Sequence, residues 1–341
     1  MNGYNPFTPD DERNETVKRY ESYLTGESTG YFDVDELETI VDFYLRKGRT
    51  KDCAQAIDFG LQLHPKNTVL LTKRAKVYLA AGDAKKAIRI LDSLSSHDDN
   101  EMSMLRIEAL IILGRDNEAR MLADYIISQE NSEADLICLD IAYFYIGQLQ
   151  FETALVFLLR GVEFNAKNTD LLFELAFCYE QLAKFEEAIQ TYQRIIDINA
   201  FSSEAWFNLG QIYFGRNDYV NALEAYDYAC SINPDDMLAL LQKGHTLFQM
   251  GLYTMALDCY LDYNDTISDS QSSIFIAECF EKMEDFKSAL MYYKLAVEYD
   301  PESFDGLCGA AVCLLELESY AESIEYAEKA LRIDENASDA W

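Results

Sequence analysis

A pattern of large and small residues recurs along most of this chain at a spacing of about 34 residues, and it constrains the fold more than any other feature. Its clearest copy lies in residues 203–236 and comprises Trp206, Leu209, Gly210, Tyr213, Ala222, Tyr226, Ala229 and Pro234. Residues 65–68 (Pro-Lys-Asn-Thr) and 166–169 (Ala-Lys-Asn-Thr) are nearly the same, and a Leu-Leu pair follows each. A chain of 341 residues is larger than one core usually serves, so we predict an array whose units pack only on their neighbours.

The residues of this pattern resemble the consensus positions of the tetratricopeptide repeat (TPR), a motif of two antiparallel helices. The resemblance is to multi-repeat arrays of bacterial type and covers residues 34–337, which align as nine repeats. It implies an all-α fold, a right-handed superhelical α-solenoid of helix-turn-helix repeats. Small residues such as Gly210 and Ala222 would let two helices approach closely, while Trp206 and Tyr226 would fill the space between repeats. We therefore expect Trp206 to be buried.

The turns within the repeats carry their own signals. Left-handed backbone is expected where the first helix of a repeat ends, at Gly48, Gly82, Gly114, Asn217 and Gly251. Acidic residues occur where the second helix of several repeats is expected to start, and there they favour the positive end of the helix dipole; they are Asp83, Glu186, Asp218 and Asp285.

The two ends of the chain depart from the repeat pattern. Residues 1–33 are expected to form a turn followed by a capping helix over about Asp11–Leu24, with Val17, Tyr20 and Leu24 on its packed face. Asp33 and Glu36 then have the spacing of a capping box. Residues 338–341 put Trp341 at the anchor position of a possible tenth repeat, so we expect the natural chain to continue; a frayed natural end is the alternative.

Charge and cysteine usage bound the partners and the compartment. The chain has 60 Asp and Glu against 28 Lys and Arg, a net charge of −32, which disfavours nucleic acid and anionic membranes and favours a basic partner. The alternative is that acidity only keeps a long array soluble. The first residues contain no signal peptide, and the eight cysteines form no CxxC, so we expect a cytoplasmic protein with reduced thiols. Cys178, Cys279 and Cys313 share one repeat position and are expected to be buried.

The sequence contains none of the motifs that would indicate an enzyme. It has no GxGxxG, P-loop, HExxH or GxSxG, and its three histidines, His64, His97 and His245, lie in different repeats. We therefore predict no catalytic residues, no metal site and no cofactor.

In the family that the chain resembles, the residues one, four, eight and eleven places after each repeat start line a concave groove. At those positions the central repeats supply a partner-binding groove made of Leu139, Tyr143, Ile146, Phe173, Phe177, Glu180, Phe207, Gln211, Phe214, Leu241, His245 and Phe248. The flanking positions are acidic and comprise Asp35, Glu38 and Asp42 on one side and Glu278, Glu281, Asp305 and Glu316 on the other.

Two functions follow from this groove. The first is an interaction scaffold that binds a peptide or helix with bulky apolar anchors and basic flanks. The second is a structural scaffold whose groove or C-terminal repeat is filled by another copy of the chain. Some TPR chaperone adaptors clamp a terminal carboxylate with Lys, Arg and Asn. Only Asn208 matches that clamp, while Lys73 and Lys76 lie in the second repeat, so we do not expect this mode.

Overall fold

The computed structural model describes residues 9–27, 30–94, 100–129 and 132–333, and it describes side chains from residue 15 onward. These residues form nineteen α-helices and no strand, which confirms the all-α prediction. Residues Met1–Leu171 form one compact unit (unit 1) and residues Leu172–Trp341 another (unit 2). The predicted division into residues 1–33, 34–337 and 338–341 stays a proposal, and Trp341 lies outside the described residues.

Unit 1 contains α1 (Pro9–Leu24), α2 (Val34–Arg46), α3 (Thr50–Leu63), α4 (Thr68–Ala80), α5 (Ala84–Ser93), α6 (Asn100–Ile112), α7 (Asp116–Gln129), α8 (Ala134–Gly147) and α9 (Phe151–Phe164). Helix α10 (Thr169–Gln181) spans the boundary between the units. Unit 2 continues with α11 (Phe185–Ile198), α12 (Ser203–Gly215), α13 (Tyr219–Ile232), α14 (Met237–Gln249), α15 (Tyr253–Thr266), α16 (Ser270–Lys282), α17 (Phe286–Tyr299), α18 (Phe304–Glu316) and α19 (Tyr320–Ile333).

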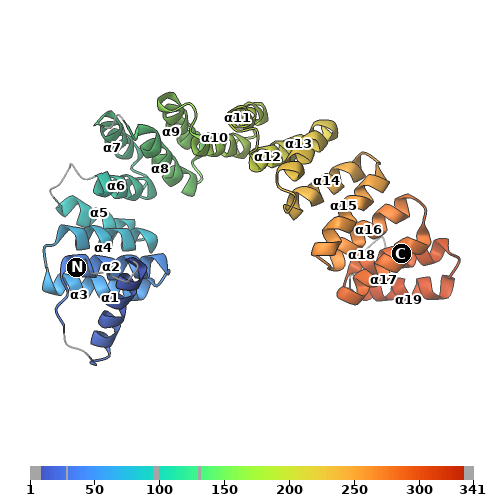
Figure 1. Ribbon diagram of the computed structural model, residues 1–341, viewed down its shortest axis with the longest axis horizontal. Helices are drawn as coiled ribbons and strands as arrows, with labels where there is room; N and C mark the ends of the chain where they lie inside the picture. The colour runs from blue at the N-terminus through green and yellow to red at the C-terminus, as the bar shows by residue number, and fades with distance from the viewer. Residues whose placement is uncertain (1–8, 28–29, 95–99, 130–131, 334–341) are drawn as a thin grey trace, which may run out of the picture. The chain divides into compact units, whose positions relative to one another are not determined.

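Within each unit the helices pack as antiparallel pairs joined by short turns (Figure 1). Four pairs lie in unit 1, namely α2–α3, α4–α5, α6–α7 and α8–α9, and four lie in unit 2, namely α12–α13, α14–α15, α16–α17 and α18–α19. The first helices of successive pairs also touch, as α2 and α4 do in unit 1 and α16 and α18 do in unit 2. Their side chains are therefore placed to share one face of each unit.

Small and large residues alternate in the core as the repeat pattern predicts. Gly210 in α12 is buried against the ring of Tyr226 in α13, and Gly244 and Tyr260 repeat this contact one pair later. Trp206 differs from expectation, because it is only half-buried. Its ring stacks on Tyr228 with the centroids 4.4 Å apart, so the indole packs on its own helix pair and is not sealed between pairs.

Helix α1 covers the start of unit 1. Val17 and Tyr20 are buried, and Tyr20 packs edge-on against Phe32 at a centroid distance of 5.6 Å. The prediction for Leu24 is wrong, because this side chain is exposed at the last residue of the helix. The predicted capping box is confirmed: Asp33 accepts from the Glu36 amide at 2.9 Å, and the Glu36 carboxylate accepts from the Asp33 amide at 3.1 Å.

The turns between paired helices have the predicted left-handed residues. Gly48, Gly82, Gly114, Asn217 and Gly251 all have positive φ. The same conformation occurs at residues that the sequence did not indicate, namely Leu149, Ala183, Glu284 and Glu318. Three of the predicted acidic residues cap the following helices, since Asp83, Asp218 and Asp285 each accept a backbone N–H from the first turn.

All eight cysteines are free thiols, and the three that share a repeat position are buried as predicted. Burial is the main cause that raises the pKa of Cys178, Cys279 and Cys313, each to about 12. These side chains therefore act as small apolar residues in the core. None of the helices in the described residues is long and apolar enough to cross a membrane.

Candidate functional site

Several residues of the predicted groove come together in unit 2, where α10 and α12 line a hollow of about 490 Å³. We call it the α10–α12 hollow, and its lining consists of Phe173, Glu174, Phe177, Glu180, Gln181, Tyr192, Glu204, Asn208 and Gln211. Four residues predicted for the groove thus meet in one depression, namely Phe173, Phe177, Glu180 and Gln211. The remaining lining residues come from the same two helices and from Tyr192 of α11.

Aromatic rings and carboxylates share the α10–α12 hollow. The ring of Phe173 rests edge-on against Tyr192 at a centroid distance of 6.2 Å, and Phe177 is 39% exposed. The Tyr192 hydroxyl donates to Glu180 at 2.6 Å, which holds this carboxylate at the wall of the hollow. Burial raises the pKa of Glu180, and the hydrogen bond from Tyr192 partly opposes that shift. The lining contains Glu174, Glu180 and Glu204 and no Lys or Arg, so its charged side chains are all acidic.

Further along unit 2, the aromatic groove residues predicted in α12 and α14 are half-buried against the second helix of their own pairs. Phe207 packs on Tyr226, Phe214 on Tyr219 and Phe248 on Tyr253, at centroid distances of 5.9, 5.6 and 5.3 Å. Leu241 is also half-buried. Each of these side chains therefore packs against the chain on one side and keeps part of its surface exposed on the other. We call the groove residues of these two helices the α12–α14 strip.

His245 belongs to the same α12–α14 strip, and its side chain packs against Tyr260 and Phe275. Its Nδ1 lies 2.7 Å from the Tyr260 hydroxyl, and its ring meets the Phe275 ring edge-on at 4.7 Å. Burial lowers its pKa, which keeps the imidazole neutral. No cluster of three or more metal-binding side chains occurs in the parts of the chain that the structure describes.

A second hollow, of about 420 Å³, lies between α16 and α18 and is reached by Phe248 of α14. We call it the α16–α18 hollow, and its lining consists of Phe248, Ile274, Glu278, Glu281, Lys282, Tyr293, Phe304, Asp305, Cys308, Gly309 and Val312. Three of the predicted flanking acids, Glu278, Glu281 and Asp305, therefore line the same depression as the predicted groove residue Phe248. The fourth, Glu316, is exposed at the end of α18 and does not line the hollow.

Like charges accumulate in the α16–α18 hollow. The Tyr293 hydroxyl donates to Glu281 at 2.7 Å, as Tyr192 does to Glu180 in the first hollow. Burial raises the pKa of Glu278, the neighbouring carboxylates of Glu281 and Asp305 raise it further, and Lys282 partly opposes them. The negative charge of Glu278 is therefore costly in the free protein, and a cation placed between these carboxylates would reduce that cost.

The groove residues predicted in α8 belong to unit 1. Leu139 is 7% exposed, so its side chain is part of the core. Tyr143 is 43% exposed and Ile146 is half-buried. Of the three, Tyr143 offers the largest surface to a partner.

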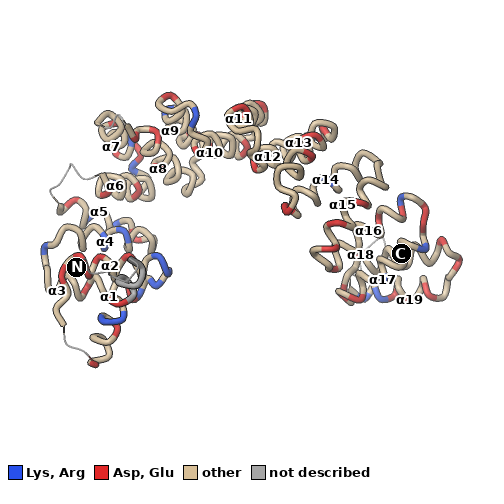
Figure 2. The backbone as a smooth tube through the Cα atoms, in the orientation of Figure 1, with Lys and Arg blue, Asp and Glu red and all other residues tan. Residues whose placement is uncertain are grey.

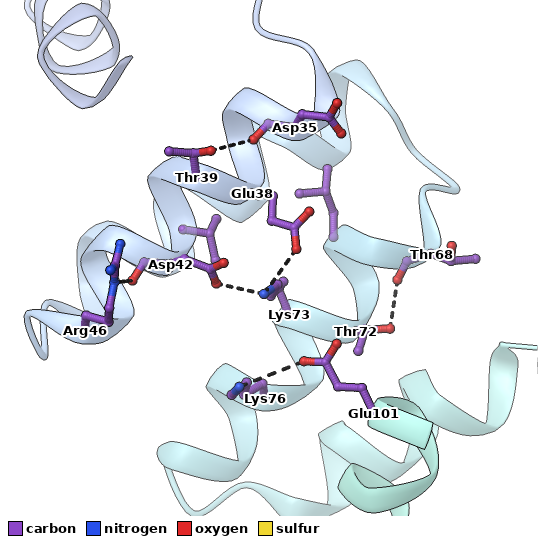
Figure 3. Close-up of polar contacts among 12 residues, drawn as sticks. Asp35, Glu38, Thr39, Asp42, Arg46, Thr68, Thr72, Lys73, Lys76 and Glu101 are labelled. Carbon is purple, nitrogen blue, oxygen red and sulfur yellow. Dashed lines mark hydrogen bonds and ion pairs between the residues drawn. The ribbon is translucent and has the colours of Figure 1, made fainter. Parts of the chain in front are cut away.

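The predicted N-terminal acids also come together, in a hollow of about 740 Å³ on α2 and α4 that is lined by Asp35, Glu38, Thr39, Asp42, Leu45, Arg46 and Lys76. Figure 3 shows Lys73 of α4 reaching between two of these acids. Its Nζ lies 2.8 Å from Asp42 and 3.3 Å from Glu38, and its side chain is 10% exposed. Burial alone would lower the pKa of Lys73, but Asp42, Glu101 and Glu38 raise it. This hollow therefore contains Arg46 and Lys76 in its lining and Lys73 between its acids, whereas Lys282 is the one Lys or Arg that lines the two hollows of unit 2.

Several lining residues were not in the predicted set. Glu204 lies one place after a repeat start, so the positional rule could have found it. Tyr192 and Tyr293 come from the second helices of their pairs. Their hydroxyls reach the groove face and donate hydrogen bonds to Glu180 and Glu281. The positional rule considers first-helix residues alone, so it could not identify these two tyrosines. Phe304 lies at a repeat start and Cys308 at a groove position of the last pair.

Three tetratricopeptide repeat family models match residues 170–202, 203–236 and 279–338. This chain is a tetratricopeptide repeat protein. These repeats support the role of a protein–protein interaction scaffold. No curated protein matches it in sequence.

Solved structures similar to parts of this TPR protein have low sequence identity to it. YrrB, described as a TPR protein with an unusual peptide-binding site, is 17% identical with a TM-score of 0.49 and covers 54% of this chain and 95% of its own. MamA from Desulfovibrio magneticus RS-1 is 16% identical with a TM-score of 0.47 and covers 50% of this chain and 97% of its own. A tetratricopeptide repeat protein from Parabacteroides merdae is 15% identical with a TM-score of 0.46 and covers 80% of this chain and 95% of its own.

Proposed function

We propose that unit 2 binds a protein segment that carries bulky apolar residues flanked by Lys or Arg, along the face formed by α10, α12, α14, α16 and α18. One observation carries this proposal: both hollows on these helices combine aromatic rings with three carboxylates each, and Lys282 is the one Lys or Arg in the two linings. The apolar rings supply area to bury, and the carboxylates supply sites for cationic side chains.

The two hollows suit slightly different parts of such a segment. In the α10–α12 hollow, a guanidinium or ammonium group could lie over Phe173 or Phe177 and still reach Glu180 and Glu204, an arrangement in which cation–π and charge attraction act together. The α16–α18 hollow offers Glu278 and Asp305 beside Phe304. Acidic residues at both places would raise the association rate of a cationic segment, and salt would lower it.

The test is a peptide-display selection on the immobilised full chain, followed by affinity measurements on the recovered peptides. The expected sequences contain two or more bulky apolar residues next to Lys or Arg. Glu180→Gln with Glu204→Gln should weaken binding about tenfold, because two cation sites are lost. The matched control, Glu325→Gln with Glu328→Gln, removes the same charge from the exposed surface of α19 and should change binding less than about twofold.

The apolar contribution has its own variant and control. Phe173→Asp with Phe207→Asp should abolish binding of the selected peptides while far-UV circular dichroism stays helical. The control, Met255→Asp with Met291→Asp, places the same charges on exposed positions of α15 and α17. It should leave binding intact, except that the two added negative charges attract a cationic peptide slightly more at low salt. Peptides that bind all four variants equally would contradict the proposed site.

Self-association is the second candidate. Leu315, Tyr320 and Ile324 are all more than half exposed on the last described helix pair, α18–α19. If a second copy covers them, sedimentation velocity will show a mass that rises with concentration, and Tyr320→Ser with Ile324→Ser will remove that rise. A constant monomer mass for the wild type would eliminate this candidate. The cytoplasm stays our proposed location, supported by the eight free thiols.

A further inference from the structure

Basic residues are concentrated in one short part of this acidic chain. Residues 46–89 contain eleven of the 28 Lys and Arg and only three of the 60 Asp and Glu. Figure 2 shows Lys and Arg gathered among the helices of unit 1 that this stretch forms, from the end of α2 to α5. The charge of this region is thus opposite to that of the chain as a whole.

Five of these residues lie at the two turns of neighbouring helix pairs or within the first three residues of the following helix, and Arg89 lies further along α5. We call these six residues the basic edge: Lys47, Arg49, Lys51, Lys85, Lys86 and Arg89. Each short connection reverses the chain, so α2 and α4 run in the same direction and place the α2–α3 and α4–α5 turns at the same end of their pairs. Helices α2 and α4 also touch, which brings the two turns within about one helix spacing of 8–10 Å.

Part of the basic edge is fixed in place. The Arg49 guanidinium lies over the Tyr44 ring at 4.7 Å and bonds Asp52 at 2.7 Å. Lys86 makes the equivalent contacts one pair later, over Tyr78 at 5.3 Å and with Asp83 at 2.7 Å.

The remaining four cations, Lys47, Lys51, Lys85 and Arg89, are exposed, and Arg89 lies near enough to Asp83 to lower its pKa. Among the described residues, no carboxylate lies within ion-pair distance of Lys47, Lys51, Lys85 or Arg89. The fixed pair therefore provides a scaffold, and these four cations are left to bind an external anion.

We infer that the basic edge binds a short acidic peptide segment of a protein partner, separately from the basic-flanked segment proposed for unit 2. About three extended residues, at 3.3–3.6 Å each, cover the spacing of about 8–10 Å between the turns, so a segment of about four to six residues reaches the cations at both turns. A longer polyanion fits poorly, because outside residues 46–89 the chain carries 57 Asp and Glu against 17 Lys and Arg, which would repel nucleic acid or an anionic membrane.

The experiment uses a fluorescently labelled oligoglutamate peptide and measures its anisotropy on titration with the full chain. The wild type should bind with an affinity that falls as salt is raised. Lys47→Glu, Lys51→Glu and Lys85→Glu together should weaken binding by about tenfold or more at low salt. The control, Lys167→Glu, Lys184→Glu and Lys287→Glu, changes the net charge equally at exposed positions elsewhere and should stay within about twofold of wild type.

Two results would overturn the inference. One is equal weakening in both triple variants, which would show that only net charge matters. The other is selective loss, in the first variant, of binding to single-stranded DNA or anionic vesicles with no binding of oligoglutamate. The peptides selected by display provide an independent readout of the site on unit 2. If oligoglutamate does not bind the basic edge, the proposed function of unit 2 is unaffected, and if no peptide is selected on unit 2, the inference about the basic edge is unaffected.

Discussion

Adding a single methyl group at Gly210 should destabilise the protein through one defined contact. A Cβ built at Gly210 lies 2.7 Å from Cε1, 2.8 Å from Cδ1 and 3.0 Å from Cζ of Tyr226. These are far shorter than an ordinary carbon–carbon contact of about 3.5–4.0 Å. Tyr226 is fully buried and packs under Phe207, so its ring has no open space into which it can move.

The expected magnitude combines two opposing terms. Overpacking a core typically costs about 1–3 kcal/mol, and the closeness of three ring atoms favours the upper end. Replacing Gly by Ala inside a helix returns about 1 kcal/mol of propensity. We therefore expect Gly210→Ala to lower the free energy of unfolding by about 2 kcal/mol. With an m-value of about 2 kcal/mol/M, the urea midpoint would fall by about 1 M.

A control in the same helix isolates the contact. Gly215 is also in α12, but a Cβ there meets no atom within 4 Å. Gly215→Ala should therefore be neutral or stabilising by up to about 1 kcal/mol. Tyr226→Leu, which shortens the opposing side chain, should reduce the penalty of Gly210→Ala in a double-mutant cycle.

The assay needs a local probe because repeat arrays can unfold in parts. Trp206 lies in α12, and Trp341 is the one other tryptophan of the sequence, so a Trp341→Phe background makes Trp206 fluorescence report on this helix. Urea unfolding followed by fluorescence and circular dichroism then gives local and global midpoints. If Gly210→Ala proved as stable as Gly215→Ala, the packing reasoning for these helix pairs would be refuted.

Three further predictions concern the turns, the thiols and one carboxylate. Ala183 has positive φ, so Ala183→Gly should stabilise by about 1 kcal/mol in urea unfolding, while Gly251→Ala should destabilise by a similar amount; the reverse order would contradict this. Cys230 is half-buried, so maleimide labelling with mass mapping should modify it before the buried Cys178, whose pKa is raised to about 12; equal rates would contradict the burial. The pKa of Glu278 is raised in the folded protein, so folding favours its protonated form. Its negative charge therefore destabilises the folded state at neutral pH, and this destabilisation disappears as the pH falls and the carboxylate is protonated. Glu278→Gln should thus raise the thermal midpoint at pH 7 and give no gain below about pH 4; a pH-independent effect would argue against charge as the cause.

The helix-pair architecture could be predicted because local residues encode it. Gly210 and Tyr226 occupy positions whose sizes fit only a close helix crossing, and Gly251 marks a turn that needs left-handed backbone. Ala183 adopts the same backbone without any sequence signal, because the packed helices on either side impose the turn.

Depth of burial could not be predicted from position alone. The repeat pattern gives the side of the helix on which a residue lies, whereas the neighbouring elements decide how far it is covered. Trp206 is thus half-buried at an anchor position, and Leu139 is buried at a groove position. The tyrosine contacts to Glu180 and Glu281 were likewise unpredictable, since they depend on how far a side chain of the second helix reaches across its pair.

The most direct test of the proposed binding face is site-specific photocross-linking. A benzophenone side chain would replace either Phe177, which is 39% exposed in the α10–α12 hollow, or Met291, which is 58% exposed on α17 and outside both hollows. With a display-selected peptide bound, we expect a covalent adduct from position 177 and none from position 291. An adduct from position 291 with none from position 177 would contradict it.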